Sequence, residues 1–147
     1  MWSHRYEHIT ELTAERLWPI LANIEGWPSI DENIDTLTVE GQPAPGARFF
    51  LKPKGGPRLS FVVTDFQAPH VYSDTCRMPF AKMKTTHRLC GQSPTRIVVD
   101  IQIEGPLAWF WGRTVGRKHA SGLPAQTERF IEAARATNVE VVDGVVH

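Results

Sequence analysis

The sequence is poor in cysteine and carries no excess of charge of either sign. Its 147 residues include only two cysteines, Cys76 and Cys90, which lack metal-ligand spacing and lie in a chain long enough to fold without a disulfide. Sixteen Lys and Arg residues balance sixteen Asp and Glu residues, so there is no general positive field to attract phosphate backbones or anionic lipid headgroups. We therefore expect free thiols and no nucleic-acid partner.

Long apolar runs and familiar catalytic motifs are also missing. No stretch of 18 apolar residues occurs and the first residues are polar, which argues against integral membrane association and against a secretory signal. The Gly-x-Ser-x-Gly, His-Glu-x-x-His and dinucleotide-binding patterns are absent. These absences lead us to expect a soluble, cytoplasmic protein with no metal ion and no cofactor.

The composition is that of an ordinary globular domain. Hydrophobic residues make up 41% of the chain and charged residues 22%, which excludes collagen-like, disordered and coiled-coil classes. The length fits a single hydrophobic core. We predict one domain over residues 1–147, with a Val-rich tail at 137–147 that either docks as a strand or frays.

The N-terminal part predicts a strand followed by two short helices. Residues 2–9 place Tyr and Ile between polar residues, which suits a strand. Thr13 is a good N-cap for a helix whose apolar residues recur at helical spacing until Gly26. Pro19 should bend this helix unless it lies in the first turn. Residues 27–31 indicate one further helical turn.

Between residues 34 and 104, Gly and Pro separate short extended runs, which is typical of an antiparallel meander. In the clearest run, alternate residues from Ile97 to Ile103 are apolar, so one face should be buried and the other mostly wet. The predicted strands cover residues 34–39, 47–52, 58–66, 70–77, 82–90 and 96–104.

A long helix is predicted from Gly105 and Pro106 to about residue 136, a length of roughly 46 Å at 1.5 Å per residue. Pro124 should kink it near the middle. Gly112 and Gly116 leave one patch of the helix surface without side chains, which indicates either close packing against another element or an empty space there. The apolar stripe of this helix contains Ala108, Trp111, Val115, His119, Leu123, Phe130 and Ala134.

This order of elements resembles the helix-grip fold of the START-like, or SRPBCC, superfamily, and is most similar to its polyketide cyclase/dehydrase-type branch. The resembling segments are TAERLW at 13–18, IEGWP at 24–28, PGARF at 45–49 and EGPLA at 104–108, which leads to Leu123 and Pro124. The resemblance implies an α+β fold in which a curved antiparallel sheet of about seven strands wraps around a long C-terminal helix. It also implies an apolar cavity, which in relatives holds lipids, sterols, polyketides, plant hormones or quinones. Ile30 stands where relatives commonly have a second Trp.

A turn at residues 78–81 predicts which side chains meet across the fifth and sixth strands. The predicted pairs are Tyr72 with His87, Asp74 with Thr85 and Cys76 with Met83, and in the next hairpin Leu89 with Ile97. His87 then shares the inward face of Val99, beside Tyr72, Asp74 and Thr85. The same register places Cys76 and Cys90 beyond disulfide reach.

Two interpretations of this polar cluster stay open. In one, His87 is a general acid/base, because imidazole titrates near neutrality, with Tyr72 or Asp74 orienting it and His119 facing them from the helix. In the other, His87 is a wall histidine that hydrogen-bonds Tyr72. A slip of one residue in the register would turn Asp74 to solvent.

We expect the chain to bind a small hydrophobic or aromatic ligand, such as a lipid, a polyketide or a quinone-like molecule, in a cavity between the sheet and the C-terminal helix. One alternative is a polyketide cyclase/dehydratase-type enzyme that uses His87, with Tyr72 or Asp74, for proton transfer. Another is a protein-interaction or homodimerisation module. The three aromatic rings at 109–111 span too much of the helix circumference for all of them to be buried, so one should be exposed. The expected ligand-binding residues are Trp27, Phe49, Leu51, Phe61, Tyr72, Thr85, His87, Val99, Trp111, Val115 and His119.

Overall fold

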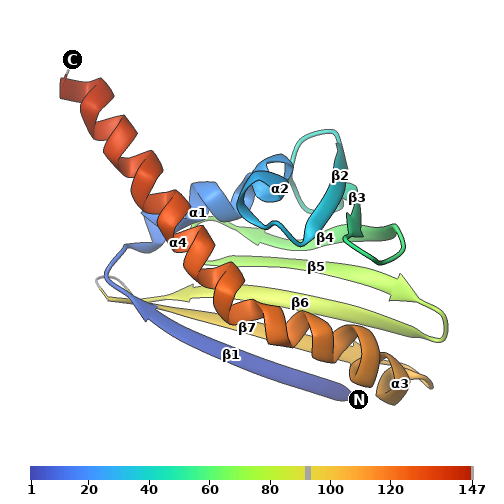
Figure 1. Ribbon diagram of the computed structural model, residues 1–147. Coiled ribbons are helices and arrows are strands. Elements are labelled where there is room, and N and C mark those ends of the chain that lie inside the picture. Colours follow the sequence, from blue (N-terminus) through green and yellow to red (C-terminus); the bar gives the residue numbers. More distant parts are fainter. Residues whose placement is uncertain (92–93, 147) are drawn as a thin grey trace.

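Antiparallel strands form one curved sheet against which a long C-terminal helix packs (Figure 1). The computed structural model describes residues 1–91 and 94–146, with side chains as far as residue 137. Its strands are β1 (Trp2–Thr10), β2 (Ile34–Glu40), β3 (Arg48–Pro53), β4 (Leu59–Gln67), β5 (Val71–Met78), β6 (Ala81–Cys90) and β7 (Thr95–Glu104). They form a seven-stranded sheet in the order β1-β7-β6-β5-β4-β3-β2. Strands β2 to β7 thus form a meander, and its last strand, β7, pairs with the N-terminal strand β1.

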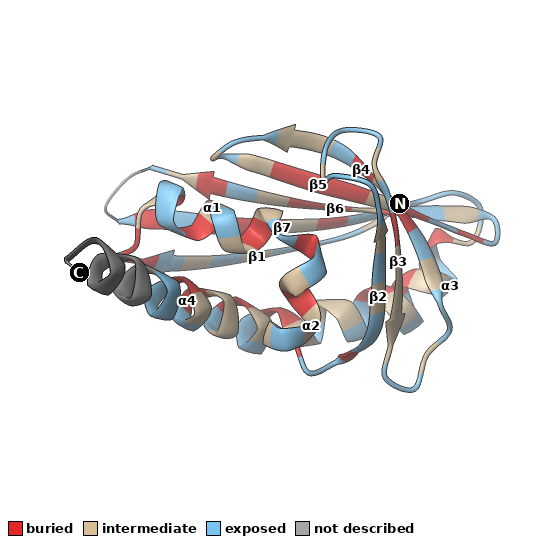
Figure 2. Ribbon diagram, turned by 90° about the horizontal axis from the view of Figure 1, so that it is seen from above, coloured by how far each residue is buried: buried red, intermediate tan, exposed pale blue. Residues whose placement is uncertain are grey.

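Helices before and after the meander cover one face of this sheet. They are α1 (Ala14–Ala22), the 3-10 turn η1 (Ile24–Gly26), α2 (Trp27–Ile30), α3 (Ala108–Trp111), the π-helical segment η2 (Gly112–Gly116) and α4 (Arg117–Val146). Figure 2 shows buried residues along β5 and on the sides of the helices that face the sheet. The predicted α+β helix-grip fold is therefore confirmed.

The predicted strand boundaries agree with the observed ones to within one residue. Thr13 precedes α1 as its N-cap with an extended backbone, as expected. Pro19 lies inside α1 beyond its first turn, and the helix ends at Ala22. The Trp27 indole N–H donates to the Leu21 carbonyl at 3.1 Å and so fixes α2 against the end of α1.

The C-terminal helix continues through Pro124, which lies inside α4. The sequence predicts that the helix ends near residue 136 and that a tail follows at 137–147, but α4 continues to Val146. The tail is therefore not a docking strand over its described residues. Among the described residues, no helix is both long enough and apolar enough to cross a membrane.

Strand β7 shows the alternation that its sequence predicts, with one exception. Its residues from Ile97 to Ile103 are buried at every second position, whereas Gln102 on the other face is exposed. Val98, expected on the wet face, is only 4% exposed. It lies between Glu7 on β1 and Arg88 on β6, and the apolar stems of long charged side chains can cover such a residue.

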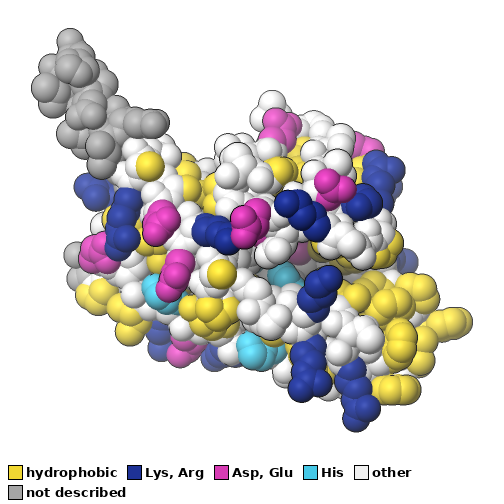
Figure 3. All heavy atoms as spheres, in the orientation of Figure 1, with side chains coloured by type: hydrophobic (Ala, Val, Ile, Leu, Met, Phe, Trp, Pro, Cys, Tyr) yellow, Lys and Arg dark blue, Asp and Glu magenta, His cyan; other side chains and the backbone are white. Residues whose placement is uncertain are grey.

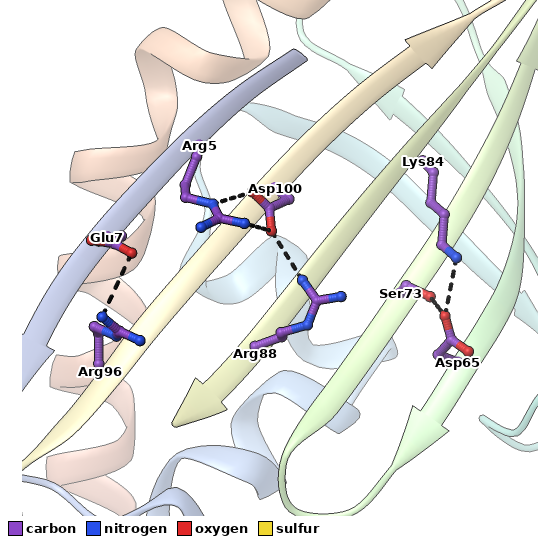
Figure 4. Close-up of polar contacts among 8 residues, drawn as sticks. All are labelled: Arg5, Glu7, Asp65, Ser73, Lys84, Arg88, Arg96 and Asp100. Carbon is purple, nitrogen blue, oxygen red and sulfur yellow. Dashed lines mark hydrogen bonds and ion pairs between the residues drawn. The ribbon is translucent and has the colours of Figure 1, made fainter. Parts of the chain in front are cut away.

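Ion pairs occupy the face of the sheet that points away from α4 (Figure 4). Asp100 accepts from Arg5 at 2.7 Å and from Arg88 at 2.9 Å, so it links three strands. Asp65 on β4 contacts Lys84 on β6 at 3.2 Å and accepts a hydrogen bond from Ser73 on β5. These charges keep the outer face hydrated, and the interior chemistry lies on the opposite face.

The two helix glycines are required by close packing. A Cβ atom on Gly116 would lie 2.7 Å from Cζ3 of Trp2, and a Cβ atom on Gly112 would overlap the same indole ring. Trp2 pairs with Ile103 across β1 and β7, so its ring fills the space between the sheet and η2. Of the two predicted reasons for these glycines, close approach is the one observed.

Candidate functional site

A polar cluster lies on the inner face of β5 and β6, beneath α4. Tyr72 pairs with His87 and Asp74 with Thr85, which confirms the predicted register. Tyr72, Asp74 and Thr85 are each no more than 5% exposed. His119 reaches the cluster from α4, where its Nε2 lies 3.5 Å from the Thr85 hydroxyl. The sheet and the long helix therefore bring together the polar residues that the sequence placed on one inward face.

The hydrogen bonds within the cluster differ from the expected ones. The Tyr72 hydroxyl donates to Asp74 Oδ2 at 2.9 Å. The Tyr72 and His87 rings are neighbours, with centroids 5.8 Å apart, but no hydrogen bond joins them. Nδ1 of His87 is buried and has no hydrogen-bond partner among the described residues. Asp74, rather than His87, is the acceptor that Tyr72 satisfies.

Burial sets the protonation states of this cluster. It raises the pKa of Asp74 to about 7, although the hydrogen bond from Tyr72 lowers it. Burial lowers the pKa of His87 to about 4, with His119 adding a further decrease, and it lowers the pKa of His119 to about 4. The pKa of Tyr72 is raised by burial and by the charge of Asp74. Near neutral pH both imidazoles are uncharged, and the group that titrates there is Asp74.

The cysteines lie apart from one another, as predicted. Cys76 pairs with Met83, whereas Cys90 pairs with Arg96 at the far end of β6. Both are free thiols. Burial and the nearby Asp74 raise the pKa of the Cys76 thiol to about 12, so this thiol stays protonated and unreactive at neutral pH.

A small cavity adjoins the cluster, between α1, α4 and the strands β6 and β7. Its volume is about 40 Å³, which accommodates a few water molecules at most. Pockets for small molecules usually exceed ~300 Å³, so the ligand-sized cavity expected from the resemblance is not open in this conformation. The lining residues are Leu17, Leu21, His87, Leu89, Ile97, Val99, Gln126, Thr127 and Phe130.

Aromatic packing explains why the cavity is small. Trp27 packs edge-on against Phe49 and against Tyr72, each with centroids 5.7 Å apart. Phe49 in turn stacks on Phe61 at 5.0 Å. These rings are almost completely buried and fill much of the interior that the resemblance suggested would be hollow.

The other expected ligand-binding residues occupy different surroundings. His87 and Val99 line the cavity. Leu51 and Val115 are partly buried and pack against the hydrophobic core. Trp111 donates its indole N–H to the Pro79 carbonyl at 2.8 Å and so anchors α3 to the turn between β5 and β6.

A second concavity, which sequence reasoning missed, lies on the surface between β1 and the start of α4. It is an open groove of about 470 Å³ whose lining residues are Trp2, Ser3, His4, Gly112, Arg113, Arg117, Ala120 and Ser121. Its sequence signal is the repeat of Gly then Arg at 112–113 and 116–117, which places two arginines on one side of a helix beside two glycines. Among the side chains that the structure describes, no group of three His, Cys, Asp or Glu residues could hold a metal ion.

Comparisons with known proteins agree on the fold. A family model described as polyketide cyclase / dehydrase and lipid transport matches residues 1–134. No curated protein sequence matches the chain.

Solved structures of similar fold come from several organisms. TTHA0849 from Thermus thermophilus is 12% identical, with a TM-score of 0.71 and coverage of 92% of this chain and 99% of that chain. Norcoclaurine synthase from Thalictrum flavum, in complex with dopamine and hydroxybenzaldehyde, is 11% identical, with a TM-score of 0.70 and coverage of 92% and 86%. The hypothetical protein jhp0584 from Helicobacter pylori is 13% identical, with a TM-score of 0.69 and coverage of 90% and 88%. At these identities the likeness shows the fold alone.

Proposed function

Because the chain belongs to the polyketide cyclase / dehydrase and lipid transport family, we propose that it binds a small hydrophobic or aromatic ligand, such as a lipid, a polyketide or a quinone-like molecule, between the sheet and α4. The observation that carries this proposal is Nδ1 of His87, a buried atom without a partner among the described residues, on a side chain that lines the cavity. An unsatisfied buried polar atom costs ~1–3 kcal/mol. A neutral imidazole nitrogen can donate to a carbonyl or accept from a hydroxyl, so a ligand with either group would recover this energy.

The cavity must enlarge before it can hold such a ligand. Phe130 of α4 lines it and is only partly buried, with its ring 6.4 Å from that of Trp27. Gln126, one turn earlier, donates to Asp31 at 3.0 Å and fixes α4 to the chain after α2. Outward rotation of Phe130 would lengthen the cavity without breaking this link, and we infer that the ligand takes the place of this ring.

A matched pair of probes tests the hydrogen bond to His87. Calorimetric titration with 1-naphthol and with naphthalene compares two ligands of similar shape, of which only the first can hydrogen-bond. The wild-type protein should bind 1-naphthol about tenfold more tightly, the value of one net hydrogen bond of about 1.4 kcal/mol. In His87→Phe this preference should disappear, while His8→Phe, which alters a histidine outside the cavity wall, should retain it.

Two results would count against this site. If neither probe binds, the proposal is wrong. If the preference for 1-naphthol persists in His87→Phe, the ligand binds elsewhere. Mass spectrometry of organic extracts from freshly purified protein provides a separate check, because a tightly held lipid should be recovered with the wild-type chain.

A second candidate function is proton transfer in a cyclase- or dehydratase-type reaction. The observation that favours it is the pKa of Asp74, about 7, because a general base works best when its pKa lies near the working pH. Asp74 would take the proton, with Tyr72 holding the carboxylate in position through the hydrogen bond of 2.9 Å. His87, uncharged at neutral pH, would serve as a hydrogen-bonding group. Confinement of a flexible poly-carbonyl chain would lower the entropic part of the barrier.

Turnover of a synthetic poly-β-ketone tests this second candidate. Asp74→Asn should lower the rate of ring closure by ~10²–10⁴-fold and abolish its dependence on pH near neutrality. Asp65→Asn changes a carboxylate on the outer face of the sheet and should leave the rate unaltered. An unchanged rate in Asp74→Asn would exclude the role of this carboxyl as a base.

A further inference from the structure

Exposed apolar side chains gather at one end of the molecule. Five large hydrophobic residues are exposed in the described part of the chain. Four of them lie at the N-terminus, in the turn between β5 and β6, and in α3, namely Met1, Phe80, Trp109 and Phe110. Their exposed fractions run from 42% for Phe110 to 79% for Met1. Figure 3 shows a continuous hydrophobic area over α3 and this turn. We call these four residues the aromatic end.

Backbone and side-chain contacts hold the aromatic end together. The Leu107 N–H donates to the Phe80 carbonyl at 3.1 Å, and Trp111 donates to the adjacent Pro79 carbonyl at 2.8 Å. On the other side Trp2, next to Met1, packs against Gly112. The exposed rings therefore project from a fixed platform, which reduces the conformational entropy lost when they bind a surface.

Positive charge borders the aromatic end although the chain as a whole is neutral. No Asp or Glu occurs between Glu104 and Glu128, while Arg113, Arg117 and Lys118 fall in this stretch. All three are exposed, and none takes part in an ion pair within the described part of the chain. Figure 3 shows basic side chains beside the hydrophobic area.

We propose that the aromatic end docks on the surface of a bilayer that contains anionic lipids. Trp and Phe rings favour the boundary between headgroups and acyl chains. Each Lys or Arg near an anionic surface adds to the attraction. Arg113 and Arg117 also line the open groove with His4, which offers a lipid phosphate two cations at the edge of the inserted rings. This docking is independent of the ligand proposed for the interior.

The same charges argue against a second copy of the chain as the occupant. A two-fold dimer would bring the same patch of each copy together, so Arg113, Arg117 and Lys118 would face their own counterparts. The stretch between Glu104 and Glu128 contains no carboxylate to compensate for them. An anionic bilayer supplies the complementary charge that residues 105–127 lack.

Sedimentation with vesicles tests the proposal. Wild-type protein should sediment with vesicles of phosphatidylcholine and phosphatidylserine, and much less with vesicles of phosphatidylcholine alone. Trp109→Ala/Phe110→Ala should weaken partitioning about tenfold, which requires the loss of only ~55 Å² of inserted apolar surface. Arg113→Gln and Arg117→Gln should each weaken it about fivefold.

Two control variants isolate the aromatic end. Ile9→Ala removes a large apolar side chain that is 67% exposed at the other end of β1, and Arg48→Gln removes an exposed cation on β3. Both should partition like the wild type, and circular dichroism should show that all variants are folded. Binding of the wild type should also fall with added salt, a result that needs no variant.

Three results would overturn the proposal. The first is wild-type protein that stays in the supernatant with anionic vesicles at low salt. The second is equal weakening by the control variants and by those at the aromatic end. The third is a lipid-free dimer, seen by light scattering across a concentration series, that Trp109→Ala/Phe110→Ala converts to a monomer.

Discussion

Replacement of Asp74 by Asn should change how the stability of the protein depends on pH. Burial raises the pKa of this carboxyl from its ordinary value of 3.8 to about 7. Between those two values the folded protein keeps a proton that the unfolded chain has released, so stability falls as the pH rises through this interval. A rise of about three pH units, at ~1.36 kcal/mol each, amounts to about 4 kcal/mol. The stabilising effect of the bound proton is complete below about pH 4 and is lost above about pH 7.

Urea unfolding of both proteins over a series of pH values measures this effect. Asn cannot ionise but still offers Tyr72 an oxygen that accepts its hydrogen bond. The free energy of unfolding of Asp74→Asn, relative to the wild type, should therefore increase by about 4 kcal/mol from about pH 4 to about pH 8. His87 and His119 are present in both proteins, so their own titrations largely cancel in the difference.

Asp65 provides the matched control with the opposite sign. Hydrogen bonds from Ser73 and Lys84 lower the pKa of Asp65. Its ionised form therefore stabilises the folded state above the ordinary pKa, and this contribution is lost as the pH falls. Asp65→Asn should lose stability relative to the wild type as the pH rises, and only slightly because the pair is exposed. A difference between Asp74→Asn and the wild type that stays constant with pH would refute the reasoning about burial.

Further substitutions examine the remaining parts of the interior. Tyr72→Phe removes the hydrogen bond that lowers the pKa of Asp74, so a ¹³C NMR titration should show a higher pKa than in the wild type, and a lower one would contradict this. Phe130→Ala should destabilise the protein by about 3 kcal/mol and tighten the binding of 1-naphthol in calorimetry, because it enlarges the cavity; unchanged affinity would mean that the ligand does not occupy this space. Gly116→Ala should lower stability by ~1–3 kcal/mol because the new methyl group meets the Trp2 ring. Gly122→Ala, with no neighbour within 4 Å, should raise it by up to ~1 kcal/mol, and equal effects in thermal denaturation would contradict the packing of Trp2.

The strands and their register could be predicted because they depend on local signals, whereas the helix-grip fold was implied by the resemblance of their order to a known family. A turn at residues 78–81 with alternating side chains on both sides is enough to bring Tyr72 opposite His87. The choice of hydrogen-bond partner could not be predicted, because it depends on distances of a few tenths of an ångström within a packed interior. The predicted register places Tyr72 beside both His87 and Asp74, and the structure shows that its hydroxyl donates to Asp74.

Cavity volume is the property that sequence patterns describe least well. The sequence shows that Trp27, Phe49 and Phe61 are apolar and inward-facing, but these rings can either line a pocket or fill it. Their mutual edge-on and stacked contacts show that they fill it. The role of Trp2 is equally non-local, since its ring meets Gly112 and Gly116 only because β1 returns to pair with β7.

The charge distribution separates the chemistry of the interior from that of the surface groove between β1 and the start of α4. In the interior both imidazoles are neutral near pH 7 and Asp74 is only partly ionised, so an anionic ligand there would meet a like charge and no cation to offset it. The interior therefore suits an uncharged molecule with few polar groups. On the surface Arg113 and Arg117 line a groove that borders exposed aromatic rings, and this combination suits anionic headgroups. Bilayer lipids can supply both partners, an uncharged apolar ligand for the interior and an anionic surface for the exterior. The two proposals are therefore compatible, although either one can be wrong without the other.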